Sequence, residues 1–102
     1  MIRSLIVKLV KRRAARREEE KNKEERIKHA CGFEERMLAH GMSLDDLNYY
    51  TLPFHESEAC EALGDNELCE EFLEGARLWF EVTAHHGVES ACDLLRQKEL
   101  QQ

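Results

Sequence analysis

Two adjacent histidines, His85 and His86, end the apolar part of the segment FEVTAHHGVE at residues 80–89. Histidine is a common metal ligand and general base, so the pair could mark a metal site or a catalytic centre. Neighbouring side chains on an α-helix point about 100° apart, however, so these imidazoles cannot bind one ion from a regular helix. Imidazoles in a last helical turn also suit the negative end of the helix dipole. A helix end is therefore the simplest interpretation of the pair.

Cysteines are the other residues that could bind a metal, and they are Cys31, Cys60, Cys69 and Cys92. Zinc ligands usually come in close Cys or His pairs, and the chain has no CxxC, HxxxH or HExxH motif. The nearest candidate pairs are His29 with Cys31 and Glu81 with His85. We therefore expect neither a metal nor a cofactor.

An even number of cysteines is compatible with disulfides, but the N-terminal apolar run SLIV is interrupted at Lys8 and no cleavage site follows. Without a secretory signal we expect a cytoplasmic protein whose thiols are free and mostly buried. Cys60 and Cys69 lie on different predicted helices and are expected in the core. No segment has the roughly 20 apolar residues that span a bilayer, so we do not expect a membrane partner.

Motifs of catalysis and nucleotide binding are missing from the sequence. There is no GxGxxG or P-loop pattern, and no glycine-rich oxyanion loop supports a Cys–His nucleophile pair. Carboxylates are numerous, but carboxylates spread over a helix face are usually solvated and do not form an acid–base pair. We therefore expect no enzyme and assign no catalytic residues.

Helix-forming residues dominate the chain, and no alternation of Val, Ile, Thr and aromatic residues indicates a strand. We predict an all-α fold, with a long N-terminal helix followed by a small helical body. The clearest helix covers residues 67–86, is capped by Asp65 or Asn66, and ends before Gly87. Its apolar stripe contains Leu68, Phe72, Gly75, Ala76, Trp79, Val82 and Thr83.

Three shorter helices are predicted at residues 44–50, 58–63 and 88–100. Ser43 and Asp46 form a capping box at the start of the first. Ser57 caps the second, which stops at Gly64.

The formal net charge of −6 is unevenly distributed. Residues 1–30 contain eleven basic and five acidic side chains, a net +6, whereas residues 31–102 contain four basic and sixteen acidic ones, a net −12. We divide the chain accordingly into a basic helical leader, residues 1–30, and an acidic helical body, residues 31–102. An acidic body repels nucleic acid and suits a partner with a basic surface.

The leader has one apolar stripe between Ile2 and Val10, flanked by basic residues. The basic residues suited to contact a partner are Arg3, Lys8, Lys11, Arg12, Arg13, Arg16 and Arg17. Such a helix suits a membrane surface, a nucleic acid or a partner's groove, or it packs in a homodimer with its charges solvated. Residues 13–30 have almost no apolar side chains, so we expect them to be solvated or to lie along a partner.

The body is small and highly charged, so we expect a homodimer, either intertwined or packed through its helices. Two copies would then bury together a larger core made of Leu68, Phe72, Trp79, Phe80 and Leu95.

The segment DNELCEEFLEGARLWFEVTAHHGVE, residues 65–89, resembles the C-terminal helix of the Gam family, the host-nuclease inhibitors of lambda-like bacteriophages. That family's helix ends in Ala-His-His, one variable residue, Val and an acid. The matching positions here are Ala84, His85, His86, Val88 and Glu89, with Glu67, Glu71, Arg77 and Glu81 in the same register. A His-Gly-x-Ser turn of the family is matched at His40, Gly41 and Ser43. The resemblance covers roughly residues 33–89 and does not include the leader.

The resemblance implies an all-helical dimer that binds the bacterial RecBCD helicase–nuclease where duplex ends enter, as a protein mimic of DNA. Carboxylates in rows on a rigid helix suit this role, because they can replace phosphates in a basic channel. The expected partner-binding residues are Glu67, Glu70, Glu71, Glu74, Glu81, His85 and His86. RecBCD or another DNA-processing enzyme is thus the expected partner, without direct binding of nucleic acid. The alternative is a small regulator that contacts DNA or a membrane through the leader.

Overall fold

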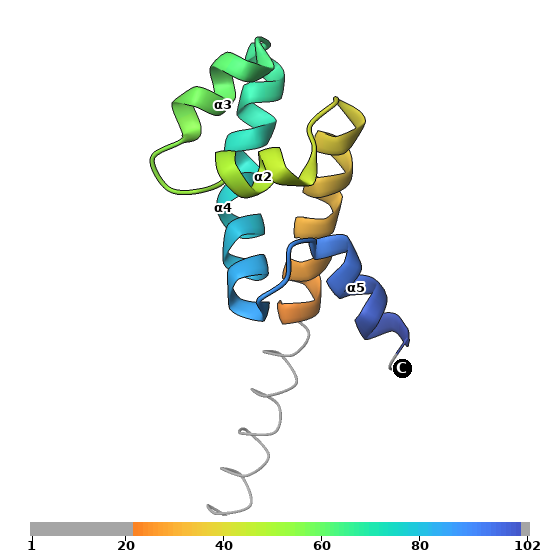
Figure 1. Cartoon of the computed structure of the whole chain (residues 1–102). Coiled ribbons are helices and arrows are strands. Elements are labelled where there is room, and N and C mark those ends of the chain that lie inside the picture. The colour runs from red at the N-terminus through yellow and green to blue at the C-terminus, as the bar shows by residue number, and fades with distance from the viewer. Residues whose placement is uncertain (1–21, 101–102) are drawn as a thin grey trace, which may run out of the picture.

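The computed structural model describes residues 22–100, which fold into a group of helices without strands (Figure 1). The first described segment is a helix over residues 22–39. It is followed by α2 (Leu44–Tyr50), α3 (Glu56–Leu63), α4 (Asn66–His86) and α5 (Ala91–Leu100). The predicted all-α class is confirmed for these residues. Most of the predicted leader helix falls on residues 1–21, which lie outside the described part of the chain.

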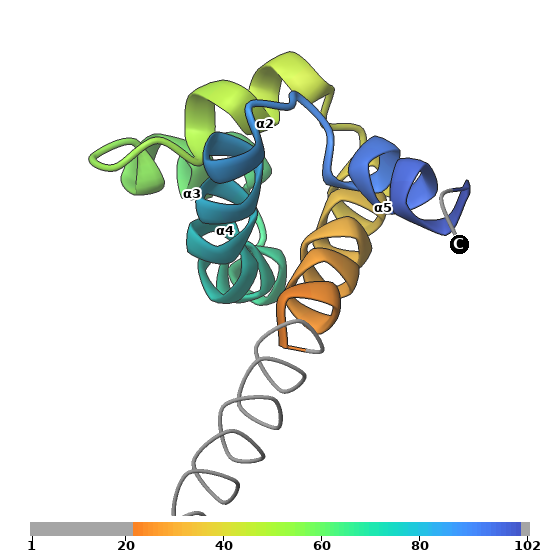
Figure 2. The same cartoon turned by 90° about the horizontal axis from the view of Figure 1, so that it is seen from below.

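The 22–39 helix and α4 run antiparallel at the centre of the fold, as Figure 1 and Figure 2 show from two directions. Contacts near both ends of the pair agree with this direction, since Arg26 pairs with Glu81 and the ring of Phe33 contacts that of Phe72. α3 packs against the first half of α4, and α5 lies on the other side of the 22–39 helix (Figure 2). The two central helices therefore carry the shorter ones.

The core fills the space between the two central helices. On the 22–39 helix, one stripe of buried side chains recurs at helical spacing: Ile27, Ala30, Phe33 and Met37. The facing stripe on α4 consists of Phe72, Ala76, Trp79, Val82 and Thr83. The stripe predicted for residues 67–86 is thus confirmed, with Leu68 half-buried at its start.

The burial of Ile27 and Ala30 corrects the expectation that residues 13–30 keep clear of the body. Ile27 is 1% exposed and Ala30 is fully buried. A single isoleucine and alanine, at the right spacing from Phe33, extend the core stripe back by two turns. The same packing buries Phe72 and Trp79 within one chain, so their burial does not require a second copy. The homodimer stays a prediction.

Gly75 sets how closely the two central helices approach. A Cβ atom placed on Gly75 would lie 2.3 Å from Cδ2 and 3.1 Å from Cβ of Phe33. Carbon atoms in contact normally lie about 3.5–4.0 Å apart, so only glycine fits this position without moving the aromatic ring. The ring of Phe33 then packs on Phe72, with 5.6 Å between the ring centroids.

Most helix ends follow the local signals of the sequence, but α3 is capped differently and α5 begins at Ala91 rather than at residue 88. The Ser43–Asp46 capping box is present at α2, with both hydrogen bonds near 3 Å. Gly64 and Gly87 end α3 and α4 in the left-handed region, which glycine adopts without strain. The predicted cap at Ser57 is wrong, because α3 begins at Glu56, two residues before the predicted start, and has no side-chain cap.

A buried carboxylate connects α5 to the two central helices. Glu34 is 2% exposed and accepts four hydrogen bonds. Its Oε1 accepts from the indole N–H of Trp79 at 3.0 Å and the backbone N–H of Ala91 at 2.8 Å. Its Oε2 accepts from the hydroxyl of Ser90 at 2.8 Å and the backbone N–H of Cys92 at 3.3 Å. The side chain thus caps the N-terminus of α5 from another helix, where a negative charge also suits the helix dipole.

The four donors keep this carboxylate ionised despite its burial. Burial alone raises the pKa of the Glu34 carboxyl, since it disfavours the charged form. The side chains of Cys92, Ser90 and Trp79 and the backbone N–H of Ala91 act in the opposite direction and together lower the pKa below its ordinary value. The native state therefore favours the charged form of Glu34.

Substitution of Gly75 tests the close approach of the central helices. In Gly75→Ala, displacing Phe33 should cost about 1–3 kcal/mol, against a gain of about 1 kcal/mol in helix propensity. We expect a net loss of stability in urea unfolding. The matched control is Gly32→Ala, because Gly32 is also helical but has no atom within 4 Å of its Cβ position. The control should gain stability, and a gain of equal size at both positions would contradict the packing described above.

Substitution of Glu34 tests the buried cap. Glu34→Gln turns an amide N–H₂ group toward donors, and we expect it to reduce the free energy of unfolding by about 2–4 kcal/mol at pH 7. Because the native pKa is lowered, the contribution of Glu34 is complete above its ordinary pKa of 4.5 and is lost as the pH falls through the native pKa. The difference between variant and parent should therefore shrink on acidification.

The control for this substitution is Glu35→Gln, at the exposed neighbouring carboxylate. It should change stability by no more than about 0.5 kcal/mol. Equal effects of the two substitutions, or a Glu34→Gln effect that is independent of pH, would show that the cap contributes little.

Candidate functional site

Four of the predicted partner-binding carboxylates form one surface on the first half of α4. They are Glu67, Glu70, Glu71 and Glu74, all exposed, and we call this surface the acidic face. At 3.6 residues per turn their side chains fall within a sector about 100° wide. None has an ion pair or hydrogen-bond partner for its carboxylate within residues 22–100. The charges are therefore free to meet a partner.

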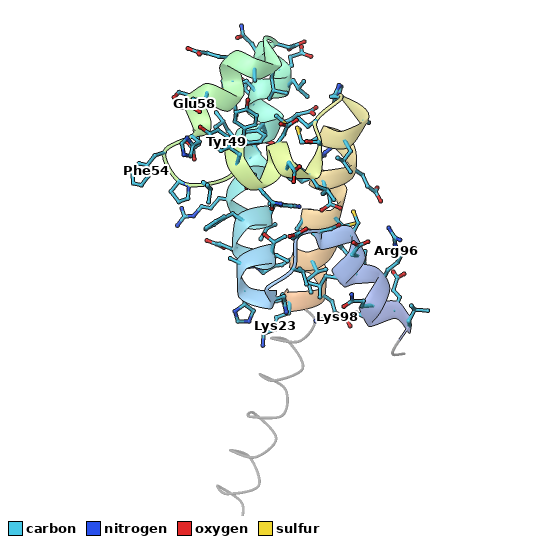
Figure 3. The ribbon with its side chains drawn as sticks, viewed as in Figure 1. Lys23, Tyr49, Phe54, Glu58, Arg96 and Lys98 are labelled. Carbon is cyan, nitrogen blue, oxygen red and sulfur yellow. A yellow bond between two sulfur atoms is a disulfide. The ribbon has the colours of Figure 1, made fainter. Side chains whose placement is uncertain are left out.

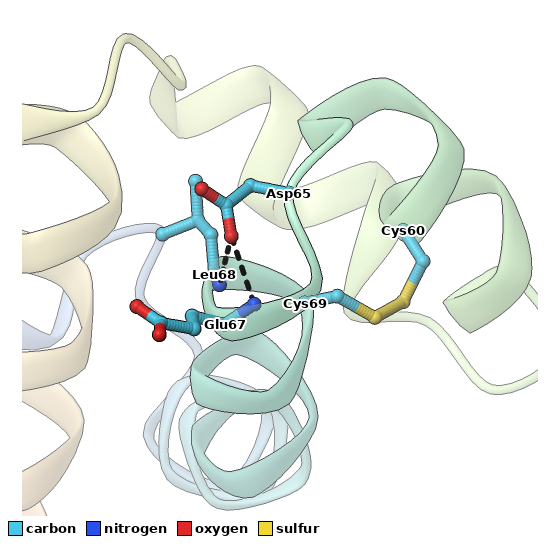
Figure 4. Close-up of a disulfide and its surroundings, with 5 residues drawn as sticks. All are labelled: Cys60, Asp65, Glu67, Leu68 and Cys69. Carbon is cyan, nitrogen blue, oxygen red and sulfur yellow. Dashed lines mark hydrogen bonds between the residues drawn. A yellow bond between two sulfur atoms is a disulfide. The ribbon is translucent and has the colours of Figure 1, made fainter.

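The acidic face begins at a well-defined helix start. The carboxylate of Asp65 accepts hydrogen bonds from the backbone N–H of Glu67 at 2.8 Å and of Leu68 at 3.3 Å (Figure 4). The sequence left Asp65 and Asn66 open as caps, and the structure shows that Asp65 is the N-cap of α4. Negative side chains in the first turns of a helix also interact favourably with its dipole.

A disulfide between Cys60 and Cys69 joins α3 to the first turn of α4 (Figure 4). The two Cα atoms lie 5.0 Å apart. The expectation of a free, buried thiol is wrong for both residues, which are half-buried at the surface where the two helices meet. Cys31 and Cys92 are free, as expected. The even cysteine count was compatible with this bond, but sequence spacing did not show which pair would meet.

α3 brings further exposed carboxylates that the sequence-based site did not include. They are Glu56, Glu58 and Glu61. The hydroxyl of Tyr49 donates to Glu58 at 2.9 Å, which ties α3 to the end of α2 (Figure 3). The density of acidic residues in the segment ESEACE was the signal that could have identified them.

Glu81 lies outside the acidic face because its charge is already paired. Its two carboxylate oxygens contact Arg26 at 2.7 Å and Arg77 at 3.3 Å. All three side chains are substantially exposed, so these pairs contribute little to stability. Their main effect is to neutralise the negative charge of Glu81 toward the surroundings.

His85 and His86 form the last residues of α4, as the helix-end interpretation predicts. Their rings stand edge to face, with centroids 4.9 Å apart, so they do not aim at one common point. Together with residues of the 22–39 helix they line a pocket of about 320 Å³. Its described lining residues are Lys23, Arg26, Ile27, Glu81, Val82, His85 and His86.

The electrostatics at this end of α4 differ from those of the acidic face. Burial is the main cause that lowers the pKa of His86, and the positive charges of Lys98 and Lys23 act in the same direction. Lys23 and Lys98 lie at the same end of the molecule (Figure 3). The lowered pKa favours the neutral form of His86 at pH 7, and this end carries both basic and acidic side chains.

The structure thus separates the predicted partner-binding residues into two groups on one helix. Glu67, Glu70, Glu71 and Glu74 share the acidic face, whereas Glu81 and the two histidines belong to the C-terminal end of α4, where charges of both signs lie. The predicted leader contacts, from Arg3 to Arg17, lie outside the described residues.

Comparisons with protein-family models, with curated proteins and with solved structures found no match to this chain. Among residues 22–100, no helix combines the length and the apolar character needed to cross a membrane.

Removal of the disulfide tests its contribution to the corner that carries the acidic face. Closing a loop of about nine residues is expected to stabilise the fold by roughly 2–3 kcal/mol. The double variant Cys60→Ser, Cys69→Ser should therefore unfold at lower urea concentration than the oxidised parent. Addition of reductant should lower the midpoint of the parent toward that of the variant and leave the variant unchanged. A parent midpoint that does not respond to reductant would show that the bond is absent or makes no contribution.

Proposed function

We propose that this protein inhibits a DNA-processing enzyme of a bacterial host by presenting its acidic face in place of DNA. The observation that supports this proposal best is the row of four exposed carboxylates on α4, which have no ion-pair partner within residues 22–100. The resemblance to the Gam family indicates RecBCD as the target and its duplex-end entry as the binding site. Inhibition of this kind needs no catalytic step and no cofactor.

The spacing of the charges is comparable to that of a nucleic-acid strand. Four carboxylates between Glu67 and Glu74 occupy about 10 Å of helix axis, since each residue rises 1.5 Å. That is on average one charge about every 3.5 Å of helix axis, close to the roughly 3.4 Å of duplex axis per phosphate of one DNA strand. A basic channel that binds DNA through phosphate contacts therefore also attracts this face.

The acidic face is held rigidly, which favours competition with DNA for a defined binding site over non-specific electrostatic attraction. Asp65 fixes the start of α4, and the core stripe fixes the opposite side of the helix. Charges held in place lose little conformational freedom on binding, which improves affinity.

The proposal includes the homodimer and a cytoplasmic site of action in the host. A second copy would double the number of carboxylates offered to the target. Leu73, 43% exposed on α4, is an apolar side chain that such a contact would cover.

Charge reversal on the acidic face tests the proposal. In Glu70→Lys, Glu71→Lys, Glu74→Lys, attraction to a basic channel becomes repulsion, which should cost several kcal/mol in binding. We expect at least a hundredfold rise in the concentration that protects linear duplex DNA from RecBCD. The helix should persist by circular dichroism, because lysine forms helices as well as glutamate and these positions are exposed.

A matched control changes three exposed acids elsewhere: Glu25→Lys, Glu89→Lys, Glu99→Lys. It has the same change in net charge and should inhibit much more strongly than the acidic-face variant.

Binding of the parent should also compete with duplex ends and weaken with salt. The proposal fails if the folded acidic-face variant protects DNA as well as the parent does. Salt-dependent binding of the parent to free duplex DNA would instead support the regulator that acts through its leader.

A further inference from the structure

Two free cysteines and a carboxylate lie together where α5 packs on the 22–39 helix. The potential ligand atoms of Cys31, Glu35 and Cys92 are all within 4.8 Å of one another. The Sγ atom of Cys31 lies 3.7 Å from Oε1 of Glu35, and the thiol of Cys92 donates to the backbone carbonyl of Cys31 at 3.2 Å. This cluster is separate from both the acidic face and the pocket at the histidines.

Helix geometry and the Glu34 cap bring the three side chains together. Cys31 and Glu35 are four residues apart on one helix, so they share a face. Cys92 lies in the first turn of α5, whose backbone N–H groups at Ala91 and Cys92 are bound by Glu34. The ligand atoms therefore stand on two rigid helices whose relative position is set by a buried hydrogen-bond network, as a pre-formed site requires.

We propose that Cys31, Glu35 and Cys92 bind a thiophilic divalent cation, zinc by the chemistry of the donors, with a fourth position open to water or an external ligand. Zinc–sulfur bonds of about 2.3 Å and zinc–oxygen bonds of about 2.0–2.2 Å place tetrahedral ligand atoms roughly 3.5–3.8 Å apart. The contact between Cys31 and Glu35 already has that length. Closing the remaining gaps needs shifts of about 1 Å or less, which rotation of exposed Glu35 and of the Cys92 thiol supplies.

The charge around the cluster favours a cation. Burial, followed by interactions that include Glu34 and Glu35, raises the pKa of the Cys31 thiol, and burial with Glu34 raises that of Cys92 strongly. Both thiols are therefore protonated in the metal-free protein. A divalent cation reverses this preference, because it replaces two protons and is itself attracted by the neighbouring carboxylates. Binding of one Zn²⁺ thus converts two thiols to thiolates and releases two protons.

The sequence offered no motif for this site. Cys31 and Cys92 are 61 residues apart, so the cluster contains no close pair of Cys or His residues of the kind that usually indicates a zinc site. The proposal therefore replaces the expectation of a chain without a metal. It does not depend on the proposed inhibition of a nuclease, because metal binding is measured on the protein alone.

Cobalt titration of the full chain tests the site. The protein is kept oxygen-free without reductant, so that the Cys60–Cys69 disulfide stays intact and two free thiols per chain are verified by thiol assay. We expect one Co²⁺ per chain, with the intense near-ultraviolet absorption of cobalt–thiolate bonds, and complete displacement by Zn²⁺. Binding of Zn²⁺ should also raise the urea midpoint, because only the folded chain assembles the ligands.

Variants assign the ligands. Cys31→Ser and Cys92→Ser should each abolish the absorption, and Glu35→Gln should weaken binding at least tenfold while both thiols remain. The matched control, Cys60→Ser with Cys69→Ser, should bind as the parent does. Glu35→Gln keeps the test valid if a cysteine variant fails to fold, since Glu35 is exposed. The proposal is overturned if the folded parent shows no cobalt–thiolate absorption at 1:1 stoichiometry, or if Glu35→Gln binds with unchanged affinity.

Discussion

The carboxylate of Glu34 is buried where the 22–39 helix, α4 and the start of α5 meet, and the arrangement of these elements depends on it. Its donors come from Trp79 on α4 and from the three residues that open α5. A buried charge is tolerated only when it is fully hydrogen-bonded. Each helix must therefore be positioned so that its donor reaches the carboxylate. The same contacts satisfy backbone N–H groups that the first turn of α5 would otherwise leave unpaired.

Packing around this network leaves α4 with two different sides. Gly75 allows Phe33 to approach, so one side of α4 is committed to the core. The carboxylates are consequently confined to the solvent side, where Glu81 meets Arg26 and Arg77, and those from Glu67 to Glu74 have no ion-pair partner in the described part of the chain. Acids near the N-terminus of α4 also suit the helix dipole, so the charge placement in the proposed function agrees with stability on this helix.

The cysteines divide into two pairs with different chemistry. Cys60 and Cys69 form a disulfide at the α3–α4 corner, whereas Cys31 and Cys92 keep their thiols beside two carboxylates. Disulfides persist in oxidising compartments and are generally reduced in a bacterial cytoplasm. Inhibition of a cytoplasmic nuclease would therefore have to proceed with this corner held by packing and by the Asp65 cap alone.

The sequence by itself determined the local features of this protein. The all-α class, the apolar stripe of α4, the capping box at Ser43 and the glycine ends at Gly64 and Gly87 depend on residues within a turn or two of one another. Helical spacing and cap chemistry act over that range, so they can be recognised without knowing the fold. The placement of Glu67, Glu70, Glu71 and Glu74 on one side of α4 follows from the same periodicity.

Only the tertiary structure decided which distant side chains meet. The four hydrogen bonds of Glu34, the pairing of Cys60 with Cys69, the ion pair that removes Glu81 from the acidic face and the approach of Cys92 to Cys31 all join different helices. Such contacts depend on which helix faces pack together and in what register, and no spacing within one helix encodes that choice. Glu34 illustrates the difference most clearly, because in the sequence it is one glutamate among many, and only the assembled helices surround it with donors.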